Sequence, residues 1–189
     1  MSHLKRSSVV KYPLPIRCLH WLRAFLIICL IASGWYMTSL PESDMATASF
    51  LYPNHKQFGV LVWQLALVHL AIRWRYKSIM PSTPPTLARW EAVLSHMIHR
   101  VLIALTLLVP ILGYSLSSSF SQSDGVPFFF IQHLPELLPK NDIAFTIFQT
   151  LHKYGAYLML ACILLHIIGA LKHRFLERGT EKDVIQRMF

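Results

Sequence analysis

The chain has 189 residues, of which 54% are hydrophobic and only 14% are charged, and its mean hydropathy is +0.44. Soluble domains carry about 25% charged residues, so this composition excludes a disordered chain, a fibrous repeat and an ordinary soluble enzyme. Three cysteines exclude a disulfide scaffold. A formal net charge of +9 would suit nucleic-acid binding, but the distribution of the charge favours another explanation.

Four apolar segments predict membrane-spanning helices. Each is close to the ~20 residues that cross a hydrocarbon core of ~30 Å. They cover residues 17–40, 55–74, 93–118 and 150–171. We therefore predict an all-α integral membrane protein, with a four-helix membrane domain at 17–171 between tails at 1–16 and 172–189.

The connection at 119–149 is long and contains the aromatic run Phe128-Phe129-Phe130 among three prolines. This composition predicts a short interfacial segment and not a fifth span. Within the spans, we expect glycines to allow helices to approach closely, at positions Gly34, Gly59 and Gly169.

Basic residues indicate the orientation, because cytoplasmic connections of membrane proteins are enriched in Lys and Arg. They gather in the N-terminal tail, around the connection at 75–90 and in the C-terminal tail: Lys5, Arg6, Lys11, Arg17, Arg73, Arg75, Lys77, Arg89, Lys172, Arg174, Arg178, Lys182 and Arg187. We therefore predict a multi-pass membrane protein with both termini cytoplasmic. The excess charge then faces anionic lipid, and no nucleic-acid partner is needed.

Histidines are the candidate functional residues. Ionisable side chains inside a membrane are costly, and they indicate function by default. A single histidine could serve an interhelical hydrogen bond, but eight of the ten lie in the spans or at their edges: His20, His55, His69, His96, His99, His152, His166 and His173.

The spacing of His152 and His166, 14 residues apart, places both on one face of a helix. They differ by about 40° around the helix and by ~21 Å along it, which suits two haems stacked across a bilayer. The predicted topology brings His20 to the cytoplasmic depth of His166 and His55 to the periplasmic depth of His152. Neutral imidazole is a suitable ligand for iron.

Alternatives remain at the cytoplasmic depth. Six histidines are candidates there, namely His20, His69, His96, His99, His166 and His173, whereas the periplasmic haem has His55 and His152, with His133 in a connection. The roles of His96 and His99 stay open between a metal site, helix packing and a haem contact. A histidine-rich metal or ion transporter is the other class that this set allows, although the spans contain no Asp or Glu and the chain no HExxH motif.

Several motifs together resemble the bacterial cytochrome b561 family, in the family's order and over about residues 10 to 189. They are His20-Trp21-Leu22, His55-Lys56-x-x-Gly59, His96-x-x-His99 with Pro110-x-x-Gly113, His152-Lys153-Tyr154-Gly155 and His166-x6-His173-Arg174. Two departures are evident. The glycine after His152-Lys153 comes one residue early, and His69 stands where the family often has arginine, while Arg73 matches a second arginine.

The resemblance implies a four-helix bundle with two haem b groups, ligated by histidines that match His20, His55, His152 and His166. It implies an oxidoreductase that moves electrons between quinone and another donor or acceptor. One branch of the family, the superoxide oxidases, passes electrons from superoxide to ubiquinone. The resemblance also places His173 near a quinone site, which Trp21 and Arg17 would line.

Arg73 and His69 are expected to contact a haem propionate or to surround the haem. Lys56 and Lys153 directly follow the periplasmic histidines and would pair with propionates, extend to the interface or attract superoxide. Three functions follow as hypotheses: a self-contained dihaem quinone oxidoreductase, including superoxide:ubiquinone oxidoreductase; an electron-carrying anchor for a separate periplasmic redox protein docked at 119–149; and a histidine-rich transporter.

Overall fold

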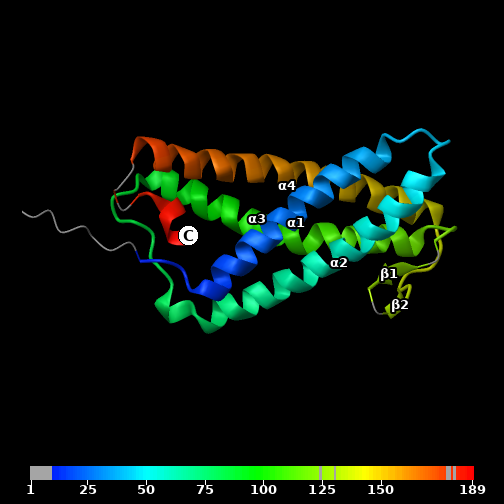
Figure 1. The fold of residues 1–189 in the computed structure, drawn as a ribbon, viewed down its shortest axis with the longest axis horizontal. Helices are drawn as coiled ribbons and strands as arrows, with labels where there is room; N and C mark the ends of the chain where they lie inside the picture. Colours follow the sequence, from blue (N-terminus) through cyan, green and yellow to red (C-terminus); the bar gives the residue numbers. More distant parts are fainter. Residues whose placement is uncertain (1–9, 124, 130, 178–179, 181) are drawn as a thin grey trace, which may run out of the picture.

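Four long helices dominate the computed structural model, which describes residues 10–123, 125–129, 131–177, 180 and 182–189. They are α1 (Leu14–Thr38), α2 (Met45–Arg75), α3 (Arg89–Ser119) and α4 (Asp142–Leu176) (Figure 1). Each is long and apolar enough to cross a membrane. The prediction of an all-α fold with four candidate spans is thus confirmed. Phe130, Lys5, Arg6, Arg178 and the first nine residues of the predicted N-terminal tail lie outside the described residues.

All four helices begin earlier than the apolar pattern predicts, α2 and α4 by the largest margins. The side chain of Asp44 accepts a hydrogen bond from the backbone N–H of Thr47 (3.2 Å), so α2 begins at Met45. Asn141 accepts in the same way from Ala144 (2.9 Å), so α4 begins at Asp142. These side chains satisfy N–H groups that have no partner within the helix. The first turns of α2 and α4 are therefore helical although their residues are not uniformly apolar.

The connection between α3 and α4 contains a two-stranded antiparallel hairpin, β1 (Val126–Phe128) and β2 (Ile131–Leu134), where the sequence predicted only an interfacial segment. Gly125 precedes it with a φ of 97°, a conformation that glycine adopts without strain. The hairpin is fastened to α2, because the backbone N–H of Phe129 donates to Oε1 of Gln57 (3.3 Å) and its ring packs edge-on against Phe58.

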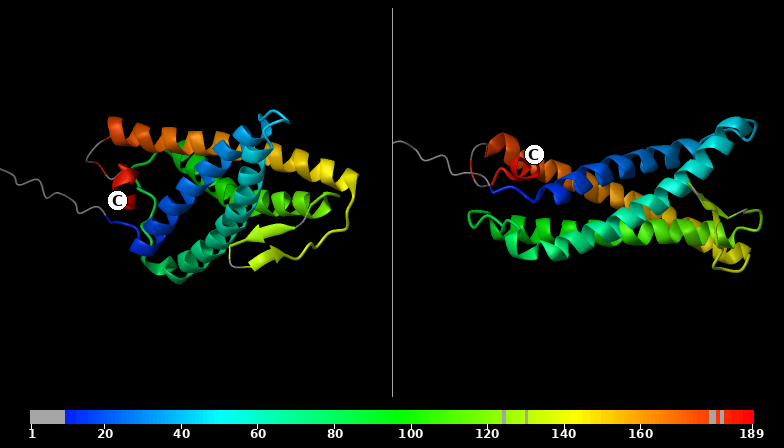
Figure 2. Two further views of the ribbon diagram at one scale, coloured as in Figure 1. Left: turned by 45° about the vertical axis from the view of Figure 1, so that its right-hand side comes forward. Right: turned by 60° about the horizontal axis from the view of Figure 1, so that its bottom comes forward.

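The bundle has two distinct ends. α3 packs along α4, α1 along α2, and α2 against α3. The hairpin end carries the α1–α2 connection, the β-hairpin and the start of α4 (Figures 1 and 2). The terminal end carries the start of α1, the short helix η1 (Lys77–Ile79), the start of α3, the end of α4 and the short helix η2 (Val184–Met188).

The apolar surface points outward along the helices, as expected for side chains that face lipid. Phe25, Val68, Leu108 and Ile168 are all exposed, each on a different helix. The buried apolar cluster is small and lies between α3 and α4, around Leu105, Val109 and Met159.

Of the three glycines predicted to allow close approach of another helix, only Gly34 has such a neighbour. A Cβ atom at Gly34 would lie 3.3 Å from Cε1 of His55. At Gly59 and Gly169 a Cβ atom would meet nothing within 4 Å, so the expectation is wrong for these two. No other helix therefore approaches closely at either glycine.

Candidate functional site

Toward the hairpin end, His55 of α2 and His152 of α4 face each other. Their ring centroids are 6.1 Å apart and the rings are inclined by 80°. Both side chains are half-buried inside the bundle. The two histidines predicted to share the periplasmic depth are therefore neighbours in space.

Hydrogen bonds fix both of these rings through Nδ1. His152 donates to the carbonyl oxygen of Val109 (2.9 Å). His55 bonds Oγ of Ser33 (3.1 Å), and Ser33 directs its own hydroxyl to the carbonyl of Leu30 (3.0 Å), so the imidazole is the donor. A neutral ring that carries its proton on Nδ1 keeps the lone pair of Nε2 for a metal ion.

Two glycines make room for the same rings. Besides the contact at Gly34, a Cβ atom at Gly113 would lie 2.9 Å from Cε1 of His152. Gly113 lies one turn after Val109 on the same face of α3, so its missing side chain opens the Val109 carbonyl to the histidine. The helices thus form a cradle shaped around the two imidazoles.

Toward the terminal end, His20 of α1 and His166 of α4 form the second pair. Their ring centroids are 6.2 Å apart, with an angle of 66° between the rings. His99 of α3 is a further neighbour, because its ring centroid is 5.0 Å from that of His166. Its Nδ1 donates to the carbonyl of Ser95 (2.7 Å), so its Nε2 is also available.

The distances distinguish among the candidates. A metal ion bound at about 2.0–2.1 Å by the nitrogens of two opposed imidazoles holds the ring centroids about 6 Å apart. Both predicted pairs match this separation, whereas His99 and His166 are closer. An iron ion with two axial imidazoles therefore fits the donor sets of the predicted pairs.

His69 differs from the paired histidines in the hydrogen bond at its Nδ1. The guanidinium of Arg23 donates to its Nδ1 (2.8 Å). Because a guanidinium has no acceptor, the neutral ring of His69 carries its proton on Nε2 and is a hydrogen-bond donor there. This arrangement disfavours His69 as a ligand and suits it to contact a carboxylate.

His96 and His133 make few contacts with the other histidines' sites. His96 donates through Nδ1 to the carbonyl of Ala92 (2.6 Å) and is exposed, and His133 is exposed on β2. Within the part of the chain that the structure describes, no group of three or more His, Cys, Asp or Glu side chains is arranged to hold a metal ion.

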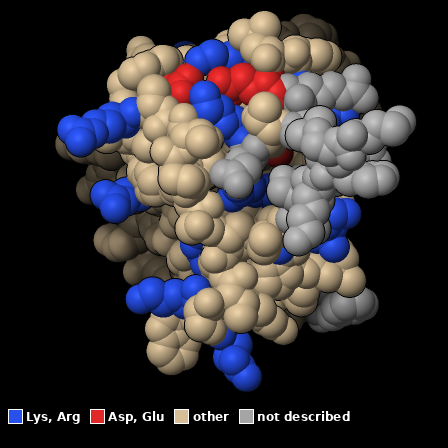
Figure 3. Space-filling model, turned by 90° about the vertical axis from the view of Figure 1, so that its left-hand side faces the viewer, with Lys and Arg blue, Asp and Glu red and all other residues tan. Residues whose placement is uncertain are grey.

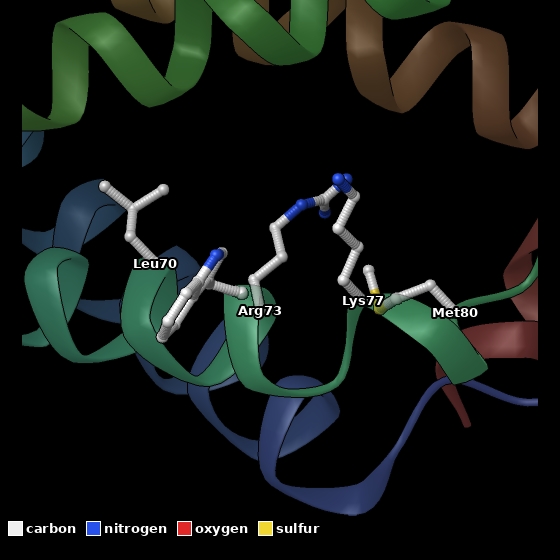
Figure 4. A pocket seen from close by; sticks show the side chains of 5 residues that line it. Leu70, Arg73, Lys77 and Met80 are labelled. Atoms are coloured by element: carbon white, nitrogen blue, oxygen red, sulfur yellow. The ribbon is translucent and has the colours of Figure 1, made fainter.

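Arg73 lines a pocket of about 360 Å³ at the end of α2, together with Leu70, Trp74, Lys77 and Met80. Figure 4 shows the charged ends of Arg73 and Lys77 directed to the same place, beneath α3 and α4. Two converging cations next to apolar side chains are suited to a carboxylate or phosphate carried on an apolar body. Lys77 is thus placed to share the role predicted for Arg73, which is contact with a haem propionate.

Lys56 and Lys153 follow His55 and His152 on α2 and α4, and Lys153 is exposed. At the surface of the terminal end, Lys and Arg side chains are spread widely while Asp and Glu gather in one patch (Figure 3). There, Lys182 donates to Glu177 (2.9 Å), which lowers the pKa of the Glu177 carboxyl and raises the pKa of Lys182.

The three residues predicted to line a quinone site lie at the terminal end. Trp21 donates its indole N–H to the carbonyl of Met188 (3.0 Å), and Nδ1 of the buried His173 bonds the carboxylate of Glu177. Among the described residues, Nε of Arg17 is buried without a hydrogen-bond partner. Arg17 therefore has a donor left for a ligand.

Sequence reasoning did not find the supports of these rings. Ser33, the Val109 carbonyl and Arg23 each fix a histidine from another helix. Arg23 follows His20 by three residues and so lies on a neighbouring position of the same helix face, which is a signal that could have been used.

The chain matches known proteins over most of its length. Residues 11–189 match the family described as prokaryotic cytochrome b561. Cytochrome b561 homolog 1 of Escherichia coli K12 is 24% identical over 166 residues, which are 86% of this chain and 89% of that protein. Cytochrome b561 homolog 2 of the same organism is 27% identical over 173 residues, 89% of this chain and 86% of that protein. The chain therefore belongs to the prokaryotic cytochrome b561 family of membrane electron-transfer proteins, which bind b-type haem.

Proposed function

We propose that this protein binds two b-type haems and carries electrons between a donor or acceptor at the hairpin end and the quinone pool, with ubiquinone as the substrate, at the terminal end. The observation that carries the proposal is the pair of facing histidine couples, with ring centroids 6.1 Å and 6.2 Å apart. His55 and His152 are the proposed axial ligands of one haem, and His20 and His166 those of the other.

Haem supplies one-electron oxidation and reduction when bound at these positions. The residues of the chain hold and separate the two groups. His152 and His166 lie ~21 Å apart along α4, so the ligands reach both leaflets of the bilayer. Arg73 and Lys77 would bind propionate carboxylates, and His69 would donate to one through Nε2.

Quinone is proposed to bind near the first turns of α1. Its carbonyl oxygen needs a hydrogen-bond donor, and the buried Nε of Arg17 is such a donor. Trp21 and His173 flank this place, although each already has a polar partner. We expect Arg17→Leu to raise the quinone concentration for half-maximal haem oxidation without changing the haem content, as measured by stopped-flow spectroscopy with Arg89→Leu as the control.

We propose that the terminal end faces the cytoplasm of a bacterial inner membrane, because the start of α1, the α2–α3 connection and the end of α4 are rich in Lys and Arg and all lie at this end. Ser78 and Ser121 are exposed at the terminal and hairpin ends respectively. In a variant whose three native cysteines are alanine, Ser121→Cys should react with an impermeant maleimide in spheroplasts, and Ser78→Cys only after lysis. The reverse pattern would contradict this orientation.

A second role has support in the hairpin. Phe129, Ile131 and Leu137 are exposed apolar side chains at the hairpin end, where a separate periplasmic redox protein would dock on an anchor subunit. Superoxide is the alternative donor there, and Lys56 and Lys153 would attract it. Reduction of the purified protein by superoxide, with quinone as acceptor and no other protein present, distinguishes the self-contained oxidoreductase from the anchor.

The direct test of the proposal is a dithionite-reduced minus oxidised spectrum of the purified protein, with haem quantified per chain. Two low-spin b haems per chain would support the proposal. One haem per chain would refute the dihaem assignment, and a folded protein without haem would refute the function and favour a transporter.

His69 provides a further prediction about the terminal-end haem. We expect His69→Leu to retain both haems, because Arg23 already occupies the Nδ1 of this ring. Loss of its Nε2 donor should lower the midpoint potential of one haem, since a propionate carboxylate would lose a hydrogen bond. Loss of a haem in this variant, together with its retention in His20→Ala, would exclude His20 as the ligand.

A further inference from the structure

The segment 182–189 folds back across the terminal end of the bundle, and its short helix η2 packs against α4 (Figure 1). The backbone N–H of Tyr12, just before α1, donates to the carbonyl of Arg187 (2.9 Å). The guanidinium of Arg187 donates to the carbonyl of Ser82 in the α2–α3 connection (2.7 Å). The segment therefore ties the start of α1 to the α2–α3 connection.

An ion pair anchors this segment to α4. Asp183 is only 1% exposed, and its carboxylate accepts a hydrogen bond from the guanidinium of Arg174 (2.7 Å). Only the carboxylate of this pair is buried, because the side chain of Arg174 is 32% exposed, and loss of Arg174 would leave the buried Asp183 carboxylate without this partner. Lys182 adds a second contact to the end of α4 through Glu177 (2.9 Å).

From this anchor, a chain of contacts leads to the terminal-end histidine pair. The carbonyl of Met188 accepts the indole N–H of Trp21 (3.0 Å), and the ring of Phe189 lies 4.9 Å from the indole at an angle of 43°. The indole in turn meets the ring of His20 edge-on, with centroids 5.3 Å apart and an angle of 78°. Trp21 is thus held on one side by the segment and touches His20 on the other.

We propose that residues 182–189 are a clamp that fixes Trp21 and, through it, the orientation of the His20 ring, so that Trp21 is a positioning residue for the terminal-end haem. The inference rests on the proposed function, in which His20 is an axial ligand. The proposal predicts an effect on the terminal-end haem alone. Ser33 and Val109 fix the rings of the hairpin-end pair, and the clamp does not reach them.

The test compares Trp21→Phe and Phe189→Ala with the wild-type protein, by electron paramagnetic resonance and by redox titration of each haem. Trp21→Phe keeps an aromatic ring and removes the N–H, while Phe189→Ala removes the stacking ring. We expect the low-spin signal of one haem to shift and its midpoint potential to fall, because a looser ligand admits water. The other haem should not change.

Phe175→Ala is the matched control. Phe175 is an aromatic residue at the terminal end of the bundle, on α4, and it is 76% exposed. It should leave both signals unchanged. Asp183→Asn removes the anchor at a distance from His20 and should change the same haem in the same direction as Trp21→Phe. Phe189→Leu replaces Phe189→Ala if the latter does not fold.

Unchanged signals in Trp21→Phe and Phe189→Ala would overturn the clamp, and so would equal shifts of both haems, which would indicate a general loss of packing. Absence of haem from the wild-type protein would instead refute the proposed function. The spectrum of the wild-type protein, recorded first, therefore separates the two failures.

Discussion

Replacement of either His55 or His152 by alanine is expected to remove the same haem and to halve the haem content per chain. The two rings face each other at 6.1 Å, and each has its Nδ1 fixed by an independent partner. An alanine at either position would leave only one of the two imidazoles that would hold this haem iron. Haem quantification and low-spin resonance spectra of the purified variants measure the effect.

The reciprocal variants make this result specific. His20→Ala and His166→Ala should remove the other haem and retain the one assigned to His55 and His152. His133→Ala is the control, because His133 is exposed on the hairpin and should leave two haems per chain. Loss of different haems in His55→Ala and His152→Ala would contradict the pairing, and so would retention of both haems in either variant.

His99 competes with His20 in this scheme. Its ring is nearer to His166 than the ring of His20 is, but its centroid distance of 5.0 Å is shorter than two imidazoles on opposite sides of one iron require. His99→Ala should therefore keep both haems. A protein that loses the terminal-end haem in His99→Ala and keeps it in His20→Ala would require the opposite assignment.

The pairing of histidines was predictable because it depends on two regular quantities. The helix repeat places His152 and His166 on one face, and the alternating direction of successive spans sets which end of each helix meets which. Both quantities can be counted along the chain. The structure accordingly brings His55 to His152 and His20 to His166.

Contacts that depend on local polar geometry were not predictable in this way. The early starts of α2 and α4 rest on the caps Asp44 and Asn141, which an apolar-segment criterion ignores. The β-hairpin depends on Gly125 and on its attachment to Gln57. The ring of Phe189 packs on Trp21, which is 168 positions away in the sequence, and no periodic pattern predicts such a contact.

Glycines gave a mixed result for the same reason. Apolar spans contain glycine both where another helix approaches and where lipid or open space lies outside, and sequence alone does not distinguish the two. Gly34 lies against His55, whereas Gly59 and Gly169 meet nothing within 4 Å. Gly113 has the closest contact of these positions, and it leads to the second prediction.

Gly113→Ala is expected to remove the hairpin-end haem although residue 113 is not a ligand. The new Cβ atom would lie 2.9 Å from Cε1 of His152, closer than real Cβ contacts, and 3.1 Å from its Nδ1. The ring must move away, and this movement breaks its hydrogen bond to the Val109 carbonyl. Without that bond, the ring no longer directs Nε2 toward His55.

Three glycines test whether contact with an imidazole is the cause. Gly34→Ala, with a contact of 3.3 Å to His55, should shift the spectrum of the hairpin-end haem with smaller loss than Gly113→Ala. A Cβ atom at Gly155 would lie 3.1 Å from Cγ2 of Val109 and would meet no imidazole atom within 4 Å, so Gly155→Ala should keep two haems per chain. Haem content per chain and thermal unfolding in detergent measure the series. Equal haem loss in Gly113→Ala and Gly155→Ala would show that the effect comes from helix packing in general and not from contact with the imidazole.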